Sequence, residues 1–90
     1  MAGYRLLIKP SAAKEVEAIG GKRDRQRVVF QIRALALKPR PVGCEKLAGL
    51  EGRFRIRHGN HRVVYFVDDT ARTVEVVKAG HRREVYRGAT

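Results

Sequence analysis

Residues 53–79, RFRIRHGNHRVVYFVDDTARTVEVVKA, carry the clearest structural pattern in the sequence. Residues 53–57 alternate strictly between arginine and an apolar side chain, which is the two-residue period of a half-buried strand. Two further strand-like runs follow at 62–67 and 73–79, separated by the turn sequences Gly59-Asn60 and Asp68-Asp69-Thr70. Because turns this short join neighbouring strands in opposite directions, the stretch predicts an antiparallel meander.

The residues before this stretch carry helical signals. Residues 4–9 predict a first strand that Pro10 stops, and Ser11 predicts the N-cap of a short helix. The apolar stripe of that helix is Ala12, Val16 and Ile19. After Gly20-Gly21, a second helix is predicted over 24–37, with its apolar face on Val28, Val29, Ile32, Leu35 and Ala36.

Residues 39–52 contain two prolines and three glycines and predict a loop or a crossover. The predicted order of elements is therefore β-α-α-β-β-β. This order indicates an α+β fold in which a helical hairpin packs on one face of an antiparallel sheet. A length of 90 residues predicts a single domain, residues 1–90.

The charge balance is strongly basic, with 20 Lys and Arg against nine Asp and Glu and a formal net charge of +11. This balance predicts a polyanionic partner, of which nucleic acid is the commonest. Solubility alone, or an anionic membrane surface, is the alternative explanation. The sequence has no apolar run long enough to span a bilayer and no signal-peptide pattern at its start, so we expect a soluble, cytoplasmic protein with no membrane partner.

The alternating arginines are the first candidate site. If Phe54 and Ile56 face the helices, then Arg53, Arg55 and Arg57 share the opposite face, where three like charges repel one another. No acidic residue lies between Arg53 and Arg62, which opens the next strand. A bound polyanion would make this arrangement favourable, whereas an ordinary solvated strand face is the alternative.

The second candidate site is GHRREVY, residues 80–86, which follows the last predicted strand. In a meander this strand can return beside the arginines and bring His81, Arg82 and Tyr86 to them. Metal-free cleavage of RNA needs a base for the 2′-OH proton, an acid for the leaving 5′-oxygen and cations for the developing charge, and these residue types can supply all three. Alternatively, Tyr86 covers the core and His81 merely ends a strand.

Metal and cofactor chemistry are not expected. The three histidines lack paired zinc-ligand spacing, and the single cysteine, Cys44, cannot complete a thiolate site. No phosphate-binding or dinucleotide-binding glycine pattern occurs.

Four segments, KLAGL (46–50), GRFRIR (52–57), NHRVVY (60–65) and GHRREVY (80–86), together resemble the RelE/ParE toxin superfamily. The resemblance covers nearly the whole chain and implies the RelE-like microbial RNase fold. It also implies the toxin of a type II toxin–antitoxin system, a metal-independent mRNA interferase that cuts mRNA in the ribosomal A site by 2′-OH attack. The implied partners are a RelB-like antitoxin, mRNA, the ribosome with its 16S rRNA, and operator DNA only through the antitoxin complex.

The same resemblance implies roles for particular residues. It places the RNA-binding cation cluster on Arg55, Arg57 and Arg62, the transition-state or general-acid arginine on Arg82, and the tyrosine that activates the 2′-OH on Tyr86. An imidazole titrates nearer neutral pH than a phenol, so His81 is a further candidate base.

Glu45 lies near the position where the related toxin YoeB has a catalytic carboxylate. The base and the acid therefore stay open among Glu45, His81, Arg82 and Tyr86. The alternative functions are a ParE-like inhibitor of DNA gyrase and a nucleic-acid-binding toxin homologue without catalysis.

Overall fold

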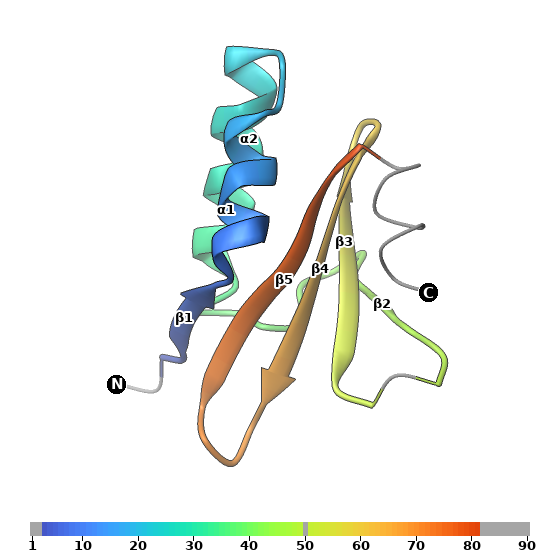
Figure 1. The fold of residues 1–90 in the computed structure, drawn as a ribbon. Coiled ribbons are helices and arrows are strands. Elements are labelled where there is room, and N and C mark those ends of the chain that lie inside the picture. The colour runs from blue at the N-terminus through green and yellow to red at the C-terminus, as the bar shows by residue number, and fades with distance from the viewer. Residues whose placement is uncertain (1–2, 50, 82–90) are drawn as a thin grey trace.

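The computed structural model describes residues 3–49 and 51–81. Within them, a five-stranded sheet has the order β1-β5-β4-β3-β2, and both helices lie on one side of it (Figure 1). The α+β class with two helices on one face is therefore confirmed. The elements in chain order are β1 (Arg5–Ile8), α1 (Pro10–Glu17), α2 (Lys22–Ala34), β2 (Glu45–Lys46), β3 (Arg53–His58), β4 (His61–Asp68) and β5 (Thr73–His81).

The predicted meander is present as β3, β4 and β5, which pair antiparallel in sequence order. The turn between β3 and β4 is Gly59-Asn60, and Gly59 has a φ of 58°. An irregularity in the pairing with β5 occurs between Val64 and Tyr65. The register places Arg57 opposite Arg62 and Arg62 opposite Gly80.

The sheet differs from the prediction at both edges. At one edge, β1 pairs with β5 in parallel, from Arg5 opposite Thr73 to Ile8 opposite Val76, so the sheet is mixed rather than wholly antiparallel. The chain leaves β1 through both helices, and no tight turn fixes the direction of β1 relative to β5. At the other edge, β2 lies within the segment predicted to be a loop and pairs with β3. Two residues are too few to show a strand period.

The helix boundaries also differ from the prediction. α1 begins at Pro10 with Lys9 at the N-cap position, so the predicted cap at Ser11 is wrong. Proline suits the first helical turn because its fixed φ matches the helix and its missing N–H would have no partner there. α2 begins at Lys22 and ends at Ala34, because residues 35–37 form a tighter turn held by bonds from each N–H to the third carbonyl before it.

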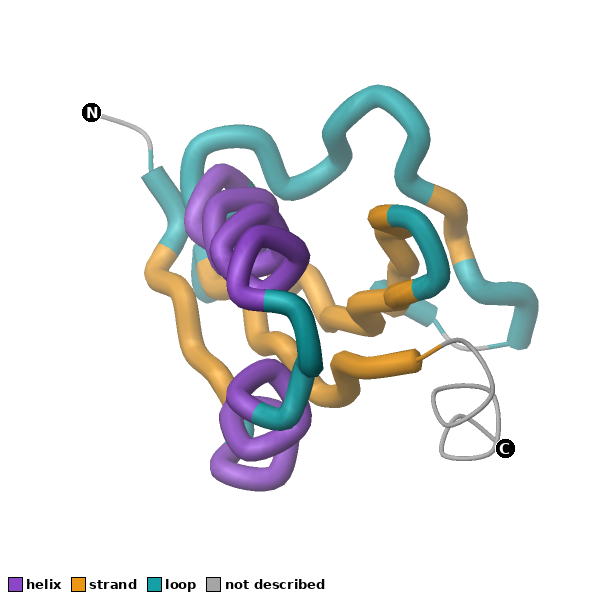
Figure 2. The backbone as a smooth tube through the Cα atoms, turned by 90° about the horizontal axis from the view of Figure 1, so that it is seen from above, coloured by secondary structure: helices purple, strands orange, loops and turns teal. Residues whose placement is uncertain are grey.

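The core lies between the two helices and the sheet (Figure 2). The predicted stripe of α1 and the central part of the predicted face of α2 are buried, and every second residue of β3 is buried against them. The buried core residues are Ala12, Val16, Ile19, Val28, Ile32, Leu35, Phe54, Ile56, Val63, Tyr65, Val67, Val74, Val76 and Ala79.

A polar cluster fixes the loop that precedes β2. Arg40 forms an ion pair with Asp69 at 2.6 Å, and the Tyr4 hydroxyl donates a hydrogen bond to the same carboxylate at 2.6 Å. The Tyr65 hydroxyl donates to the carbonyl of Pro39 at 2.7 Å. These contacts hold the start of the loop against the β4–β5 turn. Asp68 accepts a hydrogen bond from the N–H of Ala71 within that turn at 3.0 Å, as its turn sequence predicted.

Candidate nucleic-acid interface

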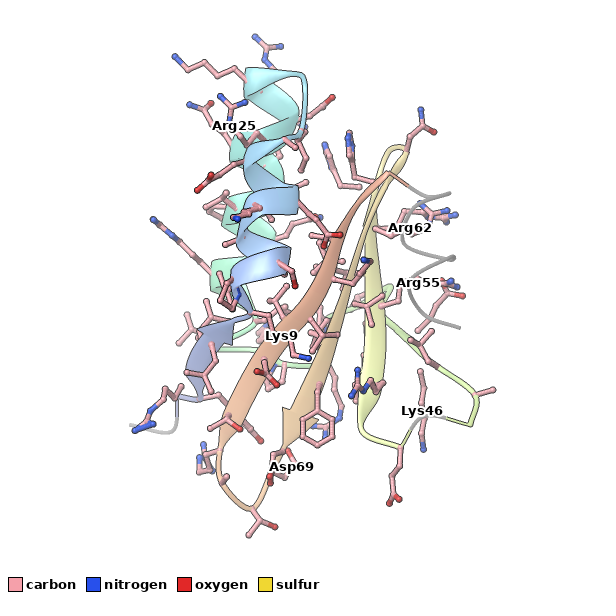
Figure 3. All side chains as sticks on the ribbon, in the orientation of Figure 1. Lys9, Arg25, Lys46, Arg55, Arg62 and Asp69 are labelled. Carbon is pink, nitrogen blue, oxygen red and sulfur yellow. The ribbon has the colours of Figure 1, made fainter. Side chains whose placement is uncertain are left out.

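The arginines of β3 lie on the sheet face that points away from the helices. Phe54 and Ile56 are buried in the core, and Arg53, Arg55 and Arg57 alternate with them. We call these three arginines, together with Arg62 of β4, the arginine face. Figure 3 shows Arg55 and Arg62 on the side of the sheet opposite the helices. The predicted alternation is confirmed.

Arg62 is the buried member of the arginine face, with 6% of its surface exposed. Its Nη1 atom lies 3.4 Å from the carbonyl oxygens of both Gly59 and His61, at the β3–β4 turn. Both distances are long for hydrogen bonds. Within residues 3–49 and 51–81, no carboxylate forms an ion pair with Arg62. A largely buried cation whose carbonyl contacts are long and uncharged is one to which a bound anion would add a stronger partner.

Arg55 has an acidic partner that lies far from it in sequence. Its Nη2 atom is 3.1 Å from a carboxylate oxygen of Glu45, and the two residues are paired across β2 and β3. The absence of acidic residues in the sequence between Arg53 and Arg62 therefore does not leave the whole face without a carboxylate. The two-residue strand β2 brings Glu45 to the face, with 57% of its side chain exposed.

Arg53 lies beside an aromatic ring at the other end of the arginine face. Its guanidinium carbon is 5.8 Å from the centre of the Phe66 ring, and the two residues are directly paired across β3 and β4. Sequence reasoning did not single out Phe66. Residues 63–67 are all apolar or aromatic, so the sequence shows no period there and only the register of β3 and β4 places Phe66 beside Arg53.

The backbone of β5 returns beside β4, as the meander predicted. Gly80 is paired with Arg62, and His81 is paired with His61. The backbone of His81 is therefore at the end of the sheet where Arg62 lies. Arg82 and Tyr86 lie outside the described residues.

Comparison with known proteins identifies this architecture. Residues 6–86 match the family described as the ParE toxin of the type II toxin–antitoxin system, parDE. The chain belongs to the RelE/ParE toxin superfamily. Among curated relatives, Toxin RelE of Mycobacterium tuberculosis is 31% identical over 84 residues, which cover 93% of this chain and 87% of that protein. Toxin RelG of the same organism is 35% identical over 60 residues, which cover 67% of this chain and 69% of that protein.

Solved structures of RelE toxins share the fold. The isolated E. coli RelE toxin has a TM-score of 0.75 and 29% identity, and the match covers 96% of this chain and 94% of that one. The archaeal RelE–RelB complex from Pyrococcus horikoshii OT3 has a TM-score of 0.77 and 25% identity, with 91% and 97% covered. This chain is thus a RelE-family toxin of a toxin–antitoxin system.

Two other reactive groups among the described residues, Cys44 and Tyr65, occupy structural positions. Cys44 is half-buried and packs against the core. Burial raises the pKa of the Tyr65 hydroxyl, which is already engaged with Pro39, so Tyr65 does not suit proton transfer. In the described part of the chain, no three His, Cys, Asp or Glu side chains gather as a metal site would require. No described helix is both long enough and apolar enough to cross a membrane.

Proposed function

We propose that this RelE-family toxin is a ribosome-dependent, metal-independent endoribonuclease that cuts mRNA in the A site. The observation that supports this most directly is the position of Arg62. It is buried, lacks a carboxylate partner among the described residues, and is paired with Arg57 of the neighbouring strand. Two cations at one place on a sheet suit a phosphate group, which arginine can bind through two parallel hydrogen bonds.

In the proposed reaction, the 2′-oxygen attacks the adjacent phosphorus while the bond to the 5′-oxygen breaks. The products are a 2′,3′-cyclic phosphate and a 5′-hydroxyl. A base takes the 2′-OH proton, an acid protonates the leaving 5′-oxygen, and cations stabilise the phosphorane charge. We assign charge stabilisation to Arg62 and Arg82 and RNA binding to Arg53, Arg55 and Arg57. Proton transfer is proposed for Glu45, His81 or Tyr86.

Glu45 is the member of this proton-transfer set whose side chain is described. Its carboxylate is held on the arginine face by Arg55 and is more than half exposed. It therefore offers a hydrogen-bond acceptor to a ribose hydroxyl without leaving its strand. The ion pair with Arg55 would restrict its rotation and orient it toward bound RNA.

The experiment is a translation reaction programmed with a defined mRNA, with the purified toxin added and RNA 5′ ends mapped by primer extension. We expect cuts within A-site codons that are absent when ribosomes are omitted and that leave the 2′,3′-cyclic phosphate expected of 2′-OH attack. Intact mRNA in the presence of folded toxin would contradict the proposal. This activity would take place in the cytoplasm, where mRNA is translated.

The match to a family described as ParE supports a second candidate, inhibition of DNA gyrase. The proteins of this superfamily share one scaffold, so the fold does not separate the two functions. A supercoiling assay with purified gyrase does separate them. We expect unchanged supercoiling at toxin concentrations that cut mRNA on ribosomes, whereas inhibited supercoiling with intact mRNA would favour the gyrase candidate.

We also propose that a RelB-like antitoxin binds this toxin, as RelB binds RelE in the solved complexes. An apolar pocket of about 480 Å³ lies between α2, the following loop and β3. Phe30, Leu37 and Val42 are largely exposed beside it, and Lys38 and Arg57 contribute positive charge to its lining. These features suit an amphipathic segment with acidic residues along one side. Because Arg57 lines this pocket and also belongs to the arginine face, such a segment would block RNA.

The antitoxin proposal is tested with Leu37→Asp, which places a charge in the exposed apolar surface of the pocket. We expect the variant to remain toxic but to escape neutralisation by the antitoxin encoded beside it. The control is Val77→Thr on β5, outside the pocket, which should still be neutralised. Full neutralisation of the Leu37→Asp variant would exclude this pocket as the docking site.

A further inference from the structure

An aromatic side chain stands on the arginine face at the end farthest from Arg62. Phe66 is half-buried and is not part of the core between sheet and helices. Its strand partner Arg53 lies 5.8 Å from the ring centre, measured from the guanidinium carbon. The ring does not fill the core, and part of its surface is exposed, so a ligand can contact it.

The backbone beside Phe66 is shaped around the ring. Gly52 has a φ of 77°, and a Cβ atom placed there would lie 2.6 Å from Cε1 of Phe66. Only glycine allows both this backbone conformation and the close approach. The ring is therefore supported from one side by the backbone of Gly52, which fixes its orientation.

A pocket of about 570 Å³ opens at the ring. Phe66 and Gly52 line it together with two cationic and three acidic side chains, which are Arg40, Lys46, Glu51, Asp68 and Asp69. Glu75 is paired with Phe66 on β5. Arg40 is already ion-paired with Asp69, which leaves Lys46 as the lining cation nearest to Arg53. A nucleotide would place its phosphate toward Arg53 and Lys46 and its uncharged base on the ring.

We propose that Phe66 is a stacking platform for one base of a single-stranded RNA whose scissile phosphate lies at Arg62. Base-on-aromatic stacking with an arginine beside it is the chemistry by which proteins hold single strands without reading their sequence. This inference rests on the proposed function for the identity of the ligand and adds a second contact point. Four residues along β3 separate Arg53 from Arg57, about 14 Å at the rise of a strand, so the RNA must extend beyond the cleaved nucleotides.

The test uses a 2′-O-methyl hexanucleotide, which cannot undergo 2′-OH attack, and the purified toxin without ribosomes. We expect Phe66→Leu to weaken binding of this probe by about 5- to 150-fold, the range that loss of one base stack produces. The control is Leu7→Ala on β1, where the leucine is 41% exposed at the edge of the sheet away from β3. Leu7→Ala should bind the probe like the wild type.

A second variant gives a direct signal. The chain contains no tryptophan, so Phe66→Trp introduces a single fluorophore at the proposed platform. We expect saturable quenching of its emission by the hexanucleotide, with affinity near that of the wild type. Absence of quenching in a folded Phe66→Trp protein that binds the probe would overturn the proposal, as would unchanged binding by Phe66→Leu.

These outcomes are independent of catalysis. If the toxin binds the probe through Phe66 but leaves mRNA on ribosomes intact, the endoribonuclease proposal is contradicted and the stacking proposal is not. Normal A-site cleavage together with Phe66-independent probe binding would contradict the stacking platform alone.

Discussion

Arg57 and Arg62 occupy directly opposite positions on β3 and β4, so the sheet holds two arginines side by side. Opposite like charges destabilise a strand pair, and burial of one of them adds a desolvation cost. A bound phosphate would offset both costs, which connects this pairing to the proposed use of the site.

Arg62→Met is expected to leave the toxin folded and as stable as the wild type, or more stable by about 1 kcal/mol, because it removes a poorly compensated buried cation. No described carboxylate would lose an ion-pair partner. Urea denaturation checks this expectation. A loss of several kcal/mol would show that Arg62 is a structural residue.

Glu45→Gln is expected to lower the rate of mRNA cleavage on ribosomes by about 10²- to 10⁴-fold, the usual contribution of a general acid or base. Its effect on the free energy of unfolding should be at most about 1 kcal/mol, because the ion pair with Arg55 is more than half exposed on the Glu45 side. Glu17→Gln at the end of α1 is the control and should cleave normally. A Glu45→Gln toxin with the wild-type cleavage rate would remove Glu45 from the proton-transfer set.

The Arg40–Asp69 contact predicts a dependence of stability on pH. The hydrogen bond from Arg40 lowers the pKa of Asp69 below its ordinary value of 3.8. A carboxyl group with a lower pKa in the folded state stabilises the fold while ionised, and this contribution disappears as the pH falls through that lower pKa. Asp69→Asn should therefore be less stable than the wild type near neutral pH, and the difference should shrink below pH 3.8. Urea denaturation of both proteins across this range measures the difference, and a constant difference would contradict the assignment.

Gly52 and Gly49 form a natural comparison. Both have a positive φ, 77° and 76°, but only at Gly52 would an added Cβ meet the Phe66 ring. Gly49→Ala should cost about 1 kcal/mol of stability from backbone strain alone. Gly52→Ala should cost more and should also weaken binding of the hexanucleotide by displacing the ring. Equal stability losses and equal binding would show that the ring tolerates the methyl group.

The part of the fold that follows from local periodicity was predictable. The alternation of Phe54 and Ile56 with arginines gave the correct buried face of β3, and the spacing of Ala12 and Val16 gave that of α1. The parallel pairing of β1 with β5 was not predictable in this way. The direction of β1 relative to β5 depends on how the two helices connect distant parts of the chain, and no local sequence pattern indicates this.

The same distinction between local patterns and long-range contacts applies to the candidate site. Arg57 and Arg62 are close in sequence and joined by a tight turn, so their pairing could be inferred. The contact between Glu45 and Arg55 depends on a two-residue strand, which leaves no periodic signal. The position of Phe66 beside Arg53 required the register of β3 and β4, because both faces of β4 carry large apolar side chains.

Single-turnover cleavage of a defined mRNA on programmed ribosomes measures whether the arginine face takes part in cutting mRNA. The comparison is between wild-type toxin, Arg62→Met and, as a control, Arg33→Met on the exposed surface of α2. We predict that Arg62→Met is slower than the wild type by at least about 10²-fold, the effect of removing one group that stabilises transition-state charge, and that Arg33→Met is unchanged. A folded Arg62→Met toxin that cleaves at the wild-type rate would show that Arg62 does not stabilise the transition state of cleavage.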